Sequence, residues 1–381
     1  MDGKGKKVLL VYYKLFKPGG VAKVMTTLAN ELVKEGYNVE ILLLMSPRPN
    51  FYPLNENVKI HHIDTFSHWA WKICEFNVKW FKFIPKIQNI NAYIHHVGVY
   101  LMLKKWLKKN HQNYDTIISC WYKLSSFIGS MDNAIAGKTI AWEHMSFTSM
   151  GKFYSALAKR YYKKLKYIIA TNKPGEKYYL SISRRSRTIY NIMDASFEKL
   201  NYIPFAEKKD IISIVARLDA EKNVEEFIDI ISEINLPEEW EVRIMGDGSC
   251  REKIQYKITH HNLEDKVKLM GTGDLNDVKK LITESKICCL TSTAEALPTI
   301  LIQAMFCSNV LIAYDCNYGP SDIINKNNGF LIPLKNKDLF REKLQYLLDN
   351  PADLERLSHS SYTEAQKWKK DKILEQWKKI L

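Results

Sequence analysis

Long hydrophobic runs are missing from this 381-residue chain, and none reaches the roughly 18 residues that a membrane-spanning helix needs. Its seven cysteines include no C-x-x-C pair, which favours buried free thiols in a reducing cytoplasm over a disulfide framework. Neither D-x-D in a loop nor H-E-x-x-H occurs, so the sequence gives no indication of a bound metal. The absence of G-x-x-x-x-G-K-[ST] argues against an ATPase, and the absence of G-x-G-x-x-G argues against a nicotinamide site.

Acidic residues are scarce in parts of the first half of the chain, and the formal net charge is +14. Residues 67–113 contain eight lysines and one glutamate, and residues 152–187 contain eleven basic residues and one glutamate. Residues 211–300 reverse the balance, with 17 acidic and 11 basic residues. This split predicts that the N-terminal half faces an anionic partner. No nucleic-acid-binding motif accompanies the basic segments, so nucleic acid is not the expected partner.

The length of the chain and its 46% hydrophobic content predict two domains, each with its own core. Short apolar runs alternate with helical patterns, as expected of parallel sheets with helices on both faces. The predicted fold class is therefore α/β, with two Rossmann-like parallel sheets that face each other across a crevice. Residues 197–209, which include Pro204 and mixed charges, separate the two series of strands.

The strands of the first series are predicted at residues 7–12, 38–44, 58–62, 116–119, 139–142, 167–170 and 188–191. Those of the second series are predicted at residues 211–216, 241–245, 267–270, 287–290, 310–313 and 329–332. Helices are predicted at residues 20–35, 154–165 and 300–307, and residues 363–381 are predicted to form a lysine-rich amphipathic helix with Trp368 and Trp377. No small-residue cleavage site follows the first apolar run, so we expect a strand there and not a signal peptide.

Residues 66–110 are rich in tryptophan, phenylalanine, tyrosine and lysine, and they are too many for an ordinary loop. Helices with aromatic anchors and lysine flanks lie on anionic membrane surfaces. A lysine-decorated insertion that packs on the domain core explains the same pattern. The sequence leaves both interpretations open.

Arg217 and Lys222 follow the predicted strand 211–216, and a helical pattern begins near Asn223. Open α/β sheets bind ligands beyond the carboxyl ends of their strands, so both cations are expected at a ligand site. A departing nucleotide diphosphate develops negative charge, which Arg binds bidentately and Lys binds as a point charge. Solvated surface cations at an ordinary strand-to-helix junction are the alternative.

A second segment, Glu295-Ala296-Leu297-Pro298-Thr299-Ile300-Leu301-Ile302-Gln303, joins another predicted strand to a helix. Backbone amides of this loop suit a phosphate or a sugar hydroxyl. The Glu295 carboxylate can accept hydrogen bonds from sugar hydroxyls, and Gln303 can reach a ribose. A helix-terminal charge that the helix dipole favours is the alternative explanation for Glu295.

Three shorter motifs are weaker candidates. Pro18-Gly19-Gly20 opens the first predicted helix, where backbone can approach a phosphate, although this is also an ordinary turn. Trp142-Glu143-His144 ends a strand and offers a carboxylate and an imidazole for acid/base chemistry or sugar binding, although a lone histidine at a strand end is more often a satisfied structural residue. Gly246-Asp247-Gly248 marks a tight turn at the carboxyl edge of the second sheet.

Together these motifs resemble family 4 of the retaining glycosyltransferases, which have the two-Rossmann-domain (GT-B) architecture. The resemblance covers nearly the whole chain and is strongest over residues 211–333. It implies an N-terminal acceptor-binding domain over residues 1–200, a nucleotide-sugar-binding domain over residues 209–362, and a C-terminal helix over residues 363–381 that crosses back to the first domain. The combination of motifs with a basic N-terminal insertion is similar to bacterial members that extend surface glycans.

By the same resemblance, Arg217 and Lys222 hold the diphosphate, Gly19 and Gly20 lie beside the phosphates, and His144 contacts the donor sugar. Glu295 matches the first acid of the family's E-x7-E motif. The donor site then includes Gly246, Ala296, Leu297, Pro298, Thr299 and Gln303. The chain departs from the pattern at two points: Gln303 stands where the family has its second acid, and Ala296-Leu297 replaces the usual Gly-Phe. An amide lacks the acceptor strength of a carboxylate, so donor affinity and sugar identity depend on these positions.

The resemblance implies a metal-independent transfer of a hexose or N-acetylhexosamine, with retention, from a UDP-sugar to a lipid-linked or lipopolysaccharide-type acceptor. No cofactor is expected besides the donor substrate, and the protein is expected to be cytoplasmic and peripheral at the inner face of the cell membrane. A non-catalytic partner of the same fold that binds a glycan or an active transferase is the main alternative, supported by Gln303. A sugar-nucleotide epimerase of the same fold is a further alternative.

Overall fold

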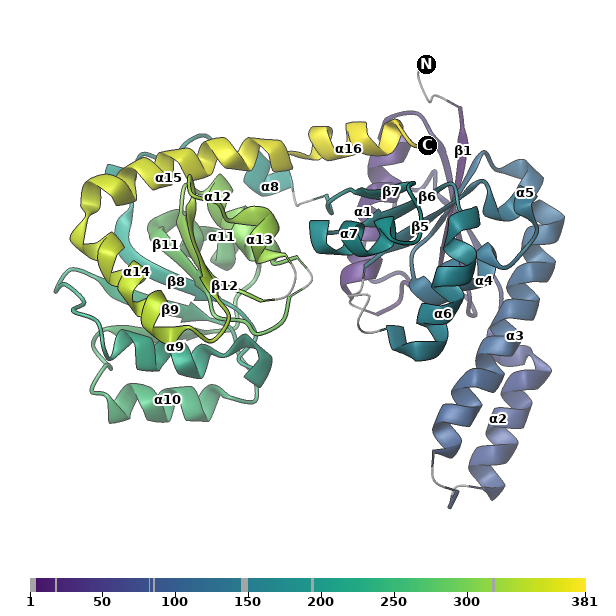
Figure 1. Cartoon of the computed structure of the whole chain (residues 1–381), viewed down its shortest axis with the longest axis horizontal. Coiled ribbons are helices and arrows are strands. Elements are labelled where there is room, and N and C mark those ends of the chain that lie inside the picture. Colours follow the sequence, from purple (N-terminus) through teal and green to yellow (C-terminus); the bar gives the residue numbers. More distant parts are fainter. Residues whose placement is uncertain are drawn as a thin grey trace. The chain divides into compact units, whose positions relative to one another are not determined.

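The computed structural model describes residues 5–17, 19–81, 83–84, 86–144, 150–192, 195–295, 297–316 and 319–381. The chain divides into two compact units (Figure 1). Met1–Ile192 and Leu374–Leu381 form the N-terminal unit, and Met193–Ile373 form the C-terminal unit. The sequence predicts the first boundary at residues 200–209 and the return to the first domain from residue 363, whereas the contacts put these points after Ile192 and at Leu374.

The N-terminal unit contains a seven-stranded parallel sheet with the order β3-β2-β1-β4-β5-β6-β7. Its strands are β1 (Lys7–Tyr12), β2 (Asn38–Leu43), β3 (Lys59–His62), β4 (Thr116–Ser119), β5 (Thr139–Glu143), β6 (Tyr167–Ala170) and β7 (Ser186–Thr188). The strand order reverses between β1 and β4, which is where open parallel sheets bind ligands.

The β1 sequence KVLLVY explains its central position, because both faces of a parallel sheet are covered and its strands are apolar throughout. Leu9 and Val11 belong to a core with residues of the following helices, and Val8 and Leu10 are equally buried on the opposite face. The carboxyl end of β1 therefore lies at the centre of a fully covered sheet.

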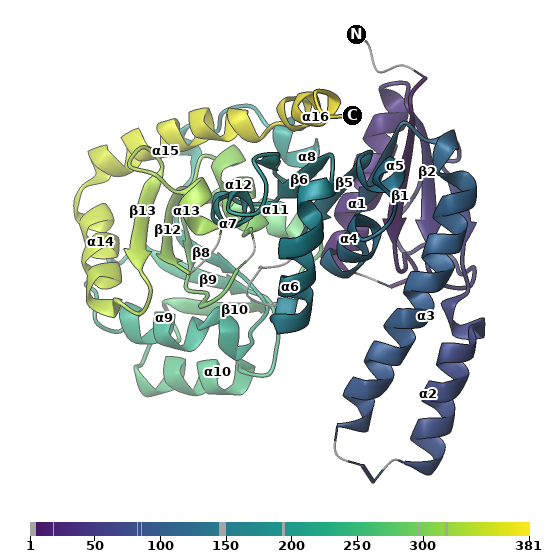
Figure 2. The same cartoon turned by 45° about the vertical axis from the view of Figure 1, so that its right-hand side comes forward.

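The helices of the N-terminal unit are α1 (Gly20–Lys34), α2 (Trp69–Trp80), α3 (Ile87–Asn110), α4 (Tyr122–Gly129), α5 (Asn133–Ala136), α6 (Gly151–Tyr161) and α7 (Lys173–Leu180). The second half of α3 packs on the sheet through Val99, Leu103 and Leu107. Its first half pairs with α2 in a helical hairpin that projects away from the sheet (Figures 1 and 2). The predicted insertion at residues 66–110 is this hairpin and its flanks.

The C-terminal unit contains a six-stranded parallel sheet with the order β10-β9-β8-β11-β12-β13. Its strands are β8 (Lys209–Val215), β9 (Glu241–Met245), β10 (Val267–Gly271), β11 (Ser285–Leu290), β12 (Val310–Asp315) and β13 (Gly329–Pro333). Here the order reverses between β8 and β11. The predicted fold class, α/β with two Rossmann-like parallel sheets, is confirmed.

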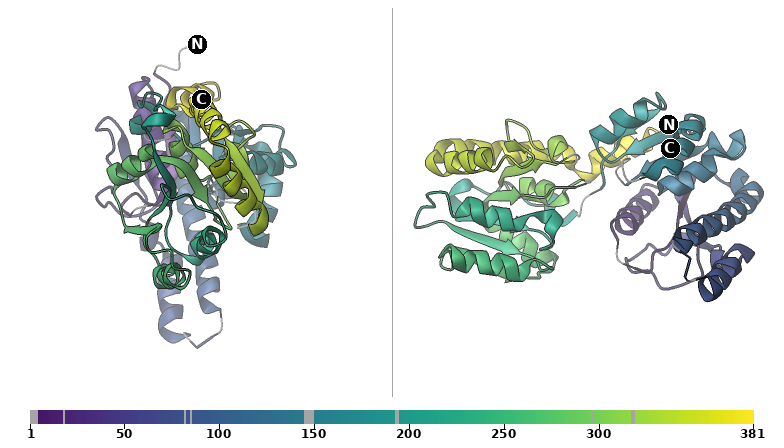
Figure 3. Two further views of the ribbon diagram at one scale, coloured as in Figure 1. Left: turned by 90° about the vertical axis from the view of Figure 1, so that its left-hand side faces the viewer. Right: turned by 60° about the horizontal axis from the view of Figure 1, so that its bottom comes forward.

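Helices lie on both sides of the C-terminal sheet (Figure 3). They are α8 (Ala195–Glu198), α9 (Val224–Ile231), α10 (Arg251–His260), α11 (Leu275–Glu284), α12 (Thr299–Phe306), α13 (Pro320–Ile323), α14 (Lys337–Asp349) and α15 (Pro351–Ala365). Ile212 and Ile214 of β8 pack in the main core with α9 and α14, whereas Ile211 packs with Leu281 of α11 on the opposite face. The alternation along β8 fixes which face each helix covers.

The C-terminal segment corrects one prediction, because residues 363–381 are not a single helix. After α15 comes a 3₁₀ turn, Gln366–Trp368, and then α16 (Lys370–Lys378). Trp368 is buried in the C-terminal unit and Trp377 is buried in the N-terminal unit, and the interruption allows each indole to reach its own core. In the N-terminal unit the carbonyl oxygen of Leu381 accepts hydrogen bonds from Thr116 and Lys166, which ties the chain end to β4.

The strand predictions are confirmed within two residues at each end, with one exception. The predicted strand at residues 188–191 is wrong, because β7 covers Ser186–Thr188. This three-residue strand lies at the sheet edge and contains Arg187, so it lacks the apolar run that marks the other strands. The helix predicted at residues 154–165 is α6, which begins at Gly151 and ends at Tyr161.

Candidate functional site

Lys222 and Glu295 meet at the reversal point of the C-terminal sheet. Lys222 ends the 3₁₀ turn Ala220–Lys222 after β8, and Glu295 lies in the loop after β11. The Lys222 Nζ atom is 2.8 Å from Oε1 of Glu295, and each side chain is only 15% exposed. The two motifs are 73 residues apart in the sequence, and the sheet topology brings them together. A cation and a hydrogen-bond acceptor thus share the ligand edge of the sheet.

Hydrogen bonds hold the loop after β11 against the turn after β8. The hydroxyl of Thr291 donates to the carbonyl oxygen of Lys222 at 3.0 Å. Thr293 donates to the carbonyl oxygen of Glu221 twice, from its backbone N–H at 2.8 Å and from its hydroxyl at 3.1 Å. These contacts fix the backbone on both sides of the Lys222–Glu295 pair, so the pair is positioned before any ligand arrives.

Arg217 lies at the same edge but its side chain is 68% exposed. Its guanidinium contacts the carboxylate of Asp219, and its Nη2 atom is 2.8 Å from Oε1 of Glu221. Glu221 Oε1 is also 3.9 Å from Nζ of Lys222, so one carboxylate lies between the two predicted phosphate ligands. Hydrogen bonds from Ser249, followed by the charge of Arg217, hold the pKa of Asp219 below its ordinary value. Arg217 therefore has to leave its present partners before it can bind a diphosphate.

Gly246 allows the loop after β9 to lie against the end of β8. Its φ is +145°, and a Cβ at this position would lie 1.8 Å from the carbonyl oxygen of Ala216. Only glycine adopts this conformation at such a close approach. A Cβ on Gly248 would likewise lie 2.6 Å from the backbone of Leu218. The predicted tight turn is present, and these glycines pack the backbone of β8 and β9 together at the ligand edge.

The predicted donor loop leads into α12, whose first residue is Thr299. Pro298 occupies the N-cap position and provides no side-chain cap, so within the described residues the first backbone N–H groups of this helix receive no hydrogen bond from that residue's side chain. Leu297 and Pro298 are buried and Thr299 is exposed, and Ala296 lies outside the described residues. Gln303 is half-buried one turn into α12. An uncapped helix start at this edge favours a negatively charged ligand.

In the N-terminal unit, Gly19 is the N-cap of α1 and Gly20 is its first residue, and Pro18 lies outside the described residues. No side chain caps this helix, and nothing lies within 4 Å of the position that a Cβ would take on either glycine. The backbone N–H of Gly19 donates to the Tyr52 hydroxyl at 3.3 Å, and the side-chain positions of both glycines are open among the described residues, which leaves room for a phosphate beside the helix start. Gly19 has an extended backbone, with φ at 177°, so its conformation does not itself demand glycine.

His144 directly follows β5, and its environment is apolar. Its ring packs on Trp142, with 4.3 Å between ring centroids, and Trp142 packs on Trp377 of α16. Burial lowers the pKa of His144 to about 3, so the imidazole is neutral at pH 7. Its buried Nε2 atom has no hydrogen-bond partner among the described residues, and residues 145–149 fall outside them. The neutral ring has a hydrogen-bonding position to offer.

Glu143, the residue before His144, is buried and points to other partners. Tyr162 donates to its Oε1 atom at 2.8 Å. Burial raises the pKa of Glu143 to about 7, against the lowering effect of hydrogen bonds from Tyr162 and Ser125. This carboxyl group is therefore hydrogen-bonded inside the N-terminal unit. It does not share the environment of His144, although the two residues are neighbours in the sequence.

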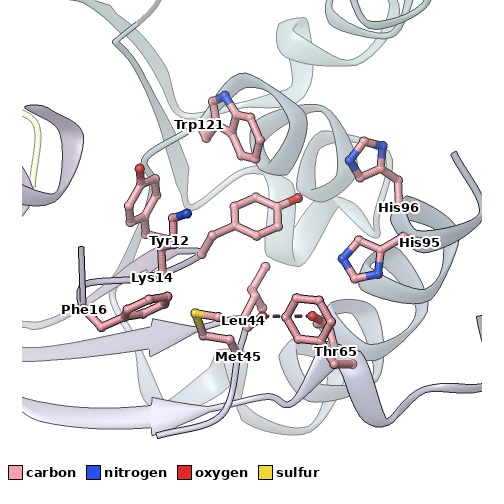
Figure 4. A pocket seen from close by; sticks show the side chains of 11 residues that line it. Tyr12, Lys14, Phe16, Leu44, Met45, Thr65, His95, His96 and Trp121 are labelled. Atoms are coloured by element: carbon pink, nitrogen blue, oxygen red, sulfur yellow. Dashed lines mark hydrogen bonds between the residues drawn. The ribbon is translucent and has the colours of Figure 1, made fainter. Parts of the chain in front are cut away.

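A pocket of about 280 Å³ lies at the carboxyl edge of the N-terminal sheet, at its own reversal point (Figure 4). Tyr12 ends β1, Tyr13 follows it and Trp121 comes after β4. His95 and His96 reach the opposite wall from α3 (Figure 4). The other lining residues are Lys14, Phe16, Leu44, Met45, Thr65 and Phe66. The hydroxyl of Tyr13 and Nδ1 of His95 are buried without hydrogen-bond partners among the described residues. Unpaired polar atoms and aromatic rings at this point suit a ligand with hydroxyl groups.

This pocket was not predicted from the sequence. The residues that directly follow β1 and β4 would have indicated one wall, because strand ends meet at one edge. The second wall depends on where α3 packs, which no local pattern gives.

The described residues contain no group of three or more His, Cys, Asp or Glu side chains arranged to hold a metal ion. No helix in the described part of the chain has the length and apolar character to span a bilayer. All seven cysteines are buried and unpaired, and burial raises the pKa of the neighbouring Cys288 and Cys289 thiols. Such thiols pack as small apolar groups.

Known proteins resemble this chain in sequence and in fold. Residues 197–364 match the family model described as "Glycosyl transferases group 1". The chain is 25% identical over 369 residues to the GalNAc-α-(1->4)-GalNAc-α-(1->3)-diNAcBac-PP-undecaprenol α-1,4-N-acetyl-D-galactosaminyltransferase of Campylobacter jejuni, a match that covers 95% of both chains. The matched family segment contains Arg217, Lys222 and Glu295.

Solved structures share the fold. The lipopolysaccharide outer core galactosyltransferase WaaB, in its apo form, matches with a TM-score of 0.76 at 18% identity and covers 98% of both chains. Anabaena HepE in complex with UDP matches with a TM-score of 0.70 at 16% identity and the same coverage. The two parallel-sheet units thus share the fold of these solved structures, and the family model matches the C-terminal unit.

Proposed function

We propose that this chain is a retaining, metal-independent glycosyltransferase. It moves a hexose or N-acetylhexosamine from a UDP-sugar to a lipid-linked oligosaccharide or lipopolysaccharide-type acceptor in bacterial surface-glycan biosynthesis. The Campylobacter relative is named for transfer to an undecaprenyl-diphosphate glycan, and the WaaB structure is named for transfer to the lipopolysaccharide core. The HepE structure contains UDP, which supports a uridine diphosphate donor for this fold.

The observation that carries the proposal is the Lys222–Glu295 pair at the reversal point of the C-terminal sheet. In the proposed mechanism the Lys222 ammonium binds the diphosphate and offsets the negative charge that develops as the sugar leaves. Glu295, released from the ion pair, accepts hydrogen bonds from sugar hydroxyls. A single contact thus couples recognition of the sugar to stabilisation of the leaving group.

The remaining site residues have proposed roles around this pair. Arg217 binds the diphosphate after it leaves Asp219 and Glu221. The open start of α12, at Leu297–Thr299, offers backbone N–H groups to the donor, and Gln303 reaches the ribose. In the N-terminal unit, the open start of α1 at Gly19 and Gly20 lies beside the phosphates, and the neutral imidazole of His144 meets the donor sugar near the reacting carbon.

The proposed location is the cytoplasmic face of the cell membrane, with the α2–α3 hairpin as the contact. Its exposed apolar side chains include Trp69, Phe76, Trp80, Phe81 and Phe83. Lysines of the same hairpin suit anionic lipid headgroups. The cationic half of the chain would then face the anionic surface at which a lipid-linked acceptor resides.

A panel of UDP-sugars tests the function. The donor should raise the melting temperature of the purified protein through binding to the folded state, and other UDP-sugars should raise it less. With the selected donor and a lipid-linked acceptor, UDP release should proceed in EDTA, and an α-configured donor should give an α-linked product by NMR. A β-linked product would contradict retention, and absence of any UDP-sugar binding would contradict the function.

The non-catalytic alternative rests on Gln303, which replaces the family's second acid. A protein of this kind would bind a glycan or an active transferase without turnover. If the protein binds UDP and also releases UDP from the UDP-sugar when acceptor is present, this alternative is rejected. Conversion of a UDP-sugar in the absence of acceptor would instead indicate an epimerase.

A further inference from the structure

A second cavity of the N-terminal unit, about 370 Å³ in volume, lies between α3, α4 and α6. Its walls are apolar and aromatic, and they include Phe127 and Tyr154, which are buried, and Leu157. At its mouth, Tyr93, Val97 and Phe153 are about half-exposed, and the rings of Tyr93 and Phe153 meet edge to face at 5.5 Å. We call this cavity the apolar groove. A groove with this lining presents few hydrogen-bonding groups to a sugar and suits a hydrocarbon chain.

The apolar groove adjoins the pocket at the sheet edge, because His96 lines both. Lys123 of α4 lies at the same boundary. Its Nζ atom is 3.4 Å from Nε2 of His96, 4.8 Å from the ring of Trp121 and 5.4 Å from the ring of Tyr154. Trp121 lines the pocket and Tyr154 lines the apolar groove. One cation therefore stands between the pocket at the sheet edge and the apolar groove.

Lys123 is half-buried and has no carboxylate within salt-bridge distance in the part of the chain that the structure describes. An ammonium group only donates hydrogen bonds, so Nε2 of His96 accepts from Lys123 and Nδ1 of His96 donates to the Tyr154 hydroxyl at 2.7 Å. Burial lowers the pKa of Lys123. A half-buried cation without an anionic partner is costly unless an anion joins it.

We propose that these three features bind a glycan carried on a lipid phosphate or diphosphate, with the hydrocarbon in the apolar groove, the phosphate on Lys123 and the sugar in the pocket at the sheet edge. The order of the features matches the order of the groups in such an amphiphile. The Tyr13 hydroxyl and Nδ1 of His95, which have no hydrogen-bond partner among the described residues, then form hydrogen bonds with sugar hydroxyls. This inference rests on the proposed function and specifies where the acceptor binds.

Farnesyl diphosphate is a soluble probe that carries the hydrocarbon and the anion without the sugar. Calorimetric titration of the full chain, with the donor site filled by excess UDP, should give saturable binding of farnesyl diphosphate. Inorganic diphosphate, which lacks the hydrocarbon, and farnesol, which lacks the anion, should each bind at least about tenfold more weakly. Equal binding of inorganic and farnesyl diphosphate would overturn the assignment of the apolar groove.

Two pairs of variants locate the probe. Lys123→Met should weaken farnesyl diphosphate at least about tenfold and leave farnesol unchanged, whereas Lys105→Met, on an exposed position of α3, should change neither. Val97→Glu places a carboxylate at the mouth of the groove and should weaken both probes, whereas Leu101→Glu, exposed one turn later on α3, should change neither. If Lys123→Met and Lys105→Met changed probe binding equally, the assignment would be overturned. The same holds if Val97→Glu and Leu101→Glu changed it equally.

The outcome separates this inference from the proposed function. If UDP binds and farnesyl diphosphate does not, the inference fails and the function stands. If farnesyl diphosphate binds as described and UDP does not, the acceptor site stands and the transferase proposal fails. If sedimentation shows a wild-type dimer that Val97→Glu dissociates, and the probe does not bind, the groove is an interface between copies and the inference is overturned.

Discussion

Replacing Lys222 with methionine removes one positive charge and keeps a straight side chain of similar length. The substitution has two separable consequences, because Nζ of Lys222 is 2.8 Å from the Glu295 carboxylate and both side chains are only 15% exposed. Glu295 loses its partner in the resting protein. In the proposed transition state, the departing diphosphate loses a cation.

The two consequences differ in size. Exposed ion pairs contribute about 0–1 kcal/mol to stability and breaking a buried pair costs about 3–5 kcal/mol, so this partly buried pair should cost about 1–3 kcal/mol. The rate of sugar transfer should fall about 100- to 1,000-fold, as it does when a group that stabilises developing charge is removed. Adding Glu295→Gln to Lys222→Met removes the unpaired negative charge. The double variant should therefore regain stability but not the rate of sugar transfer.

Denaturant unfolding and release of UDP at saturating donor and acceptor measure the two quantities on the same preparations. Lys253→Met, at an exposed lysine of α10, is the matched control and should leave both unchanged. A folded Lys222→Met protein that retains a kcat within about threefold of wild type would refute the proposed role of this cation. Recovery of the rate in the double variant would also refute it, because the lost activity would then reflect the unpaired carboxylate.

Three further predictions concern charge around the site. Glu221 lies between Arg217 and Lys222, so Glu221→Gln should release both cations and tighten UDP binding about three- to tenfold by calorimetry; weaker binding would contradict this competition. Gln303→Glu restores the acid of the related family and should raise kcat/KM for the donor about tenfold if this position reaches the ribose, whereas an unchanged value would place it out of reach. Burial raises the pKa of Glu143 from 4.5 to about 7, so the folded chain keeps a proton that the unfolded chain releases between these values. The contribution of the protonated Glu143 carboxyl to the free energy of unfolding is fully present below pH 4.5 and is lost as the pH rises through 7. Relative to Glu143→Gln, the wild type should lose about 2–3 kcal/mol between pH 4.5 and 8 in chemical denaturation, and a constant difference would show that the carboxyl is already ionised.

Much of the fold follows from local patterns, because most buried strands are short apolar runs and most helices have one apolar face. The proximity of Lys222 and Glu295 was also predictable, since the carboxyl ends of parallel strands meet at one edge. The short edge strand β7 was misplaced because its three residues carry a polar sequence. The C-terminal tail was predicted as one helix because its lysine and tryptophan spacing is helical on both sides of the turn Gln366–Trp368.

The state of Arg217 was not predictable from the strand-and-helix pattern alone. Asp219 and Glu221 are close in sequence, but only the conformation of the turn after β8 shows that both reach the guanidinium. The pocket at the edge of the N-terminal sheet depends on long-range packing, because His95 and His96 reach it from α3. Half of α3 packs on the sheet and half projects in the hairpin, so its apolar residues do not mark a single face.

Calorimetric titration of UDP into the metal-free chain, in EDTA, tests the central claim most directly. The account predicts saturable binding at one site per chain, with at least about tenfold weaker binding in Lys222→Met. Equal affinity in both proteins, or no binding by the wild type, would contradict the claim that this lysine binds the phosphates of a nucleotide sugar.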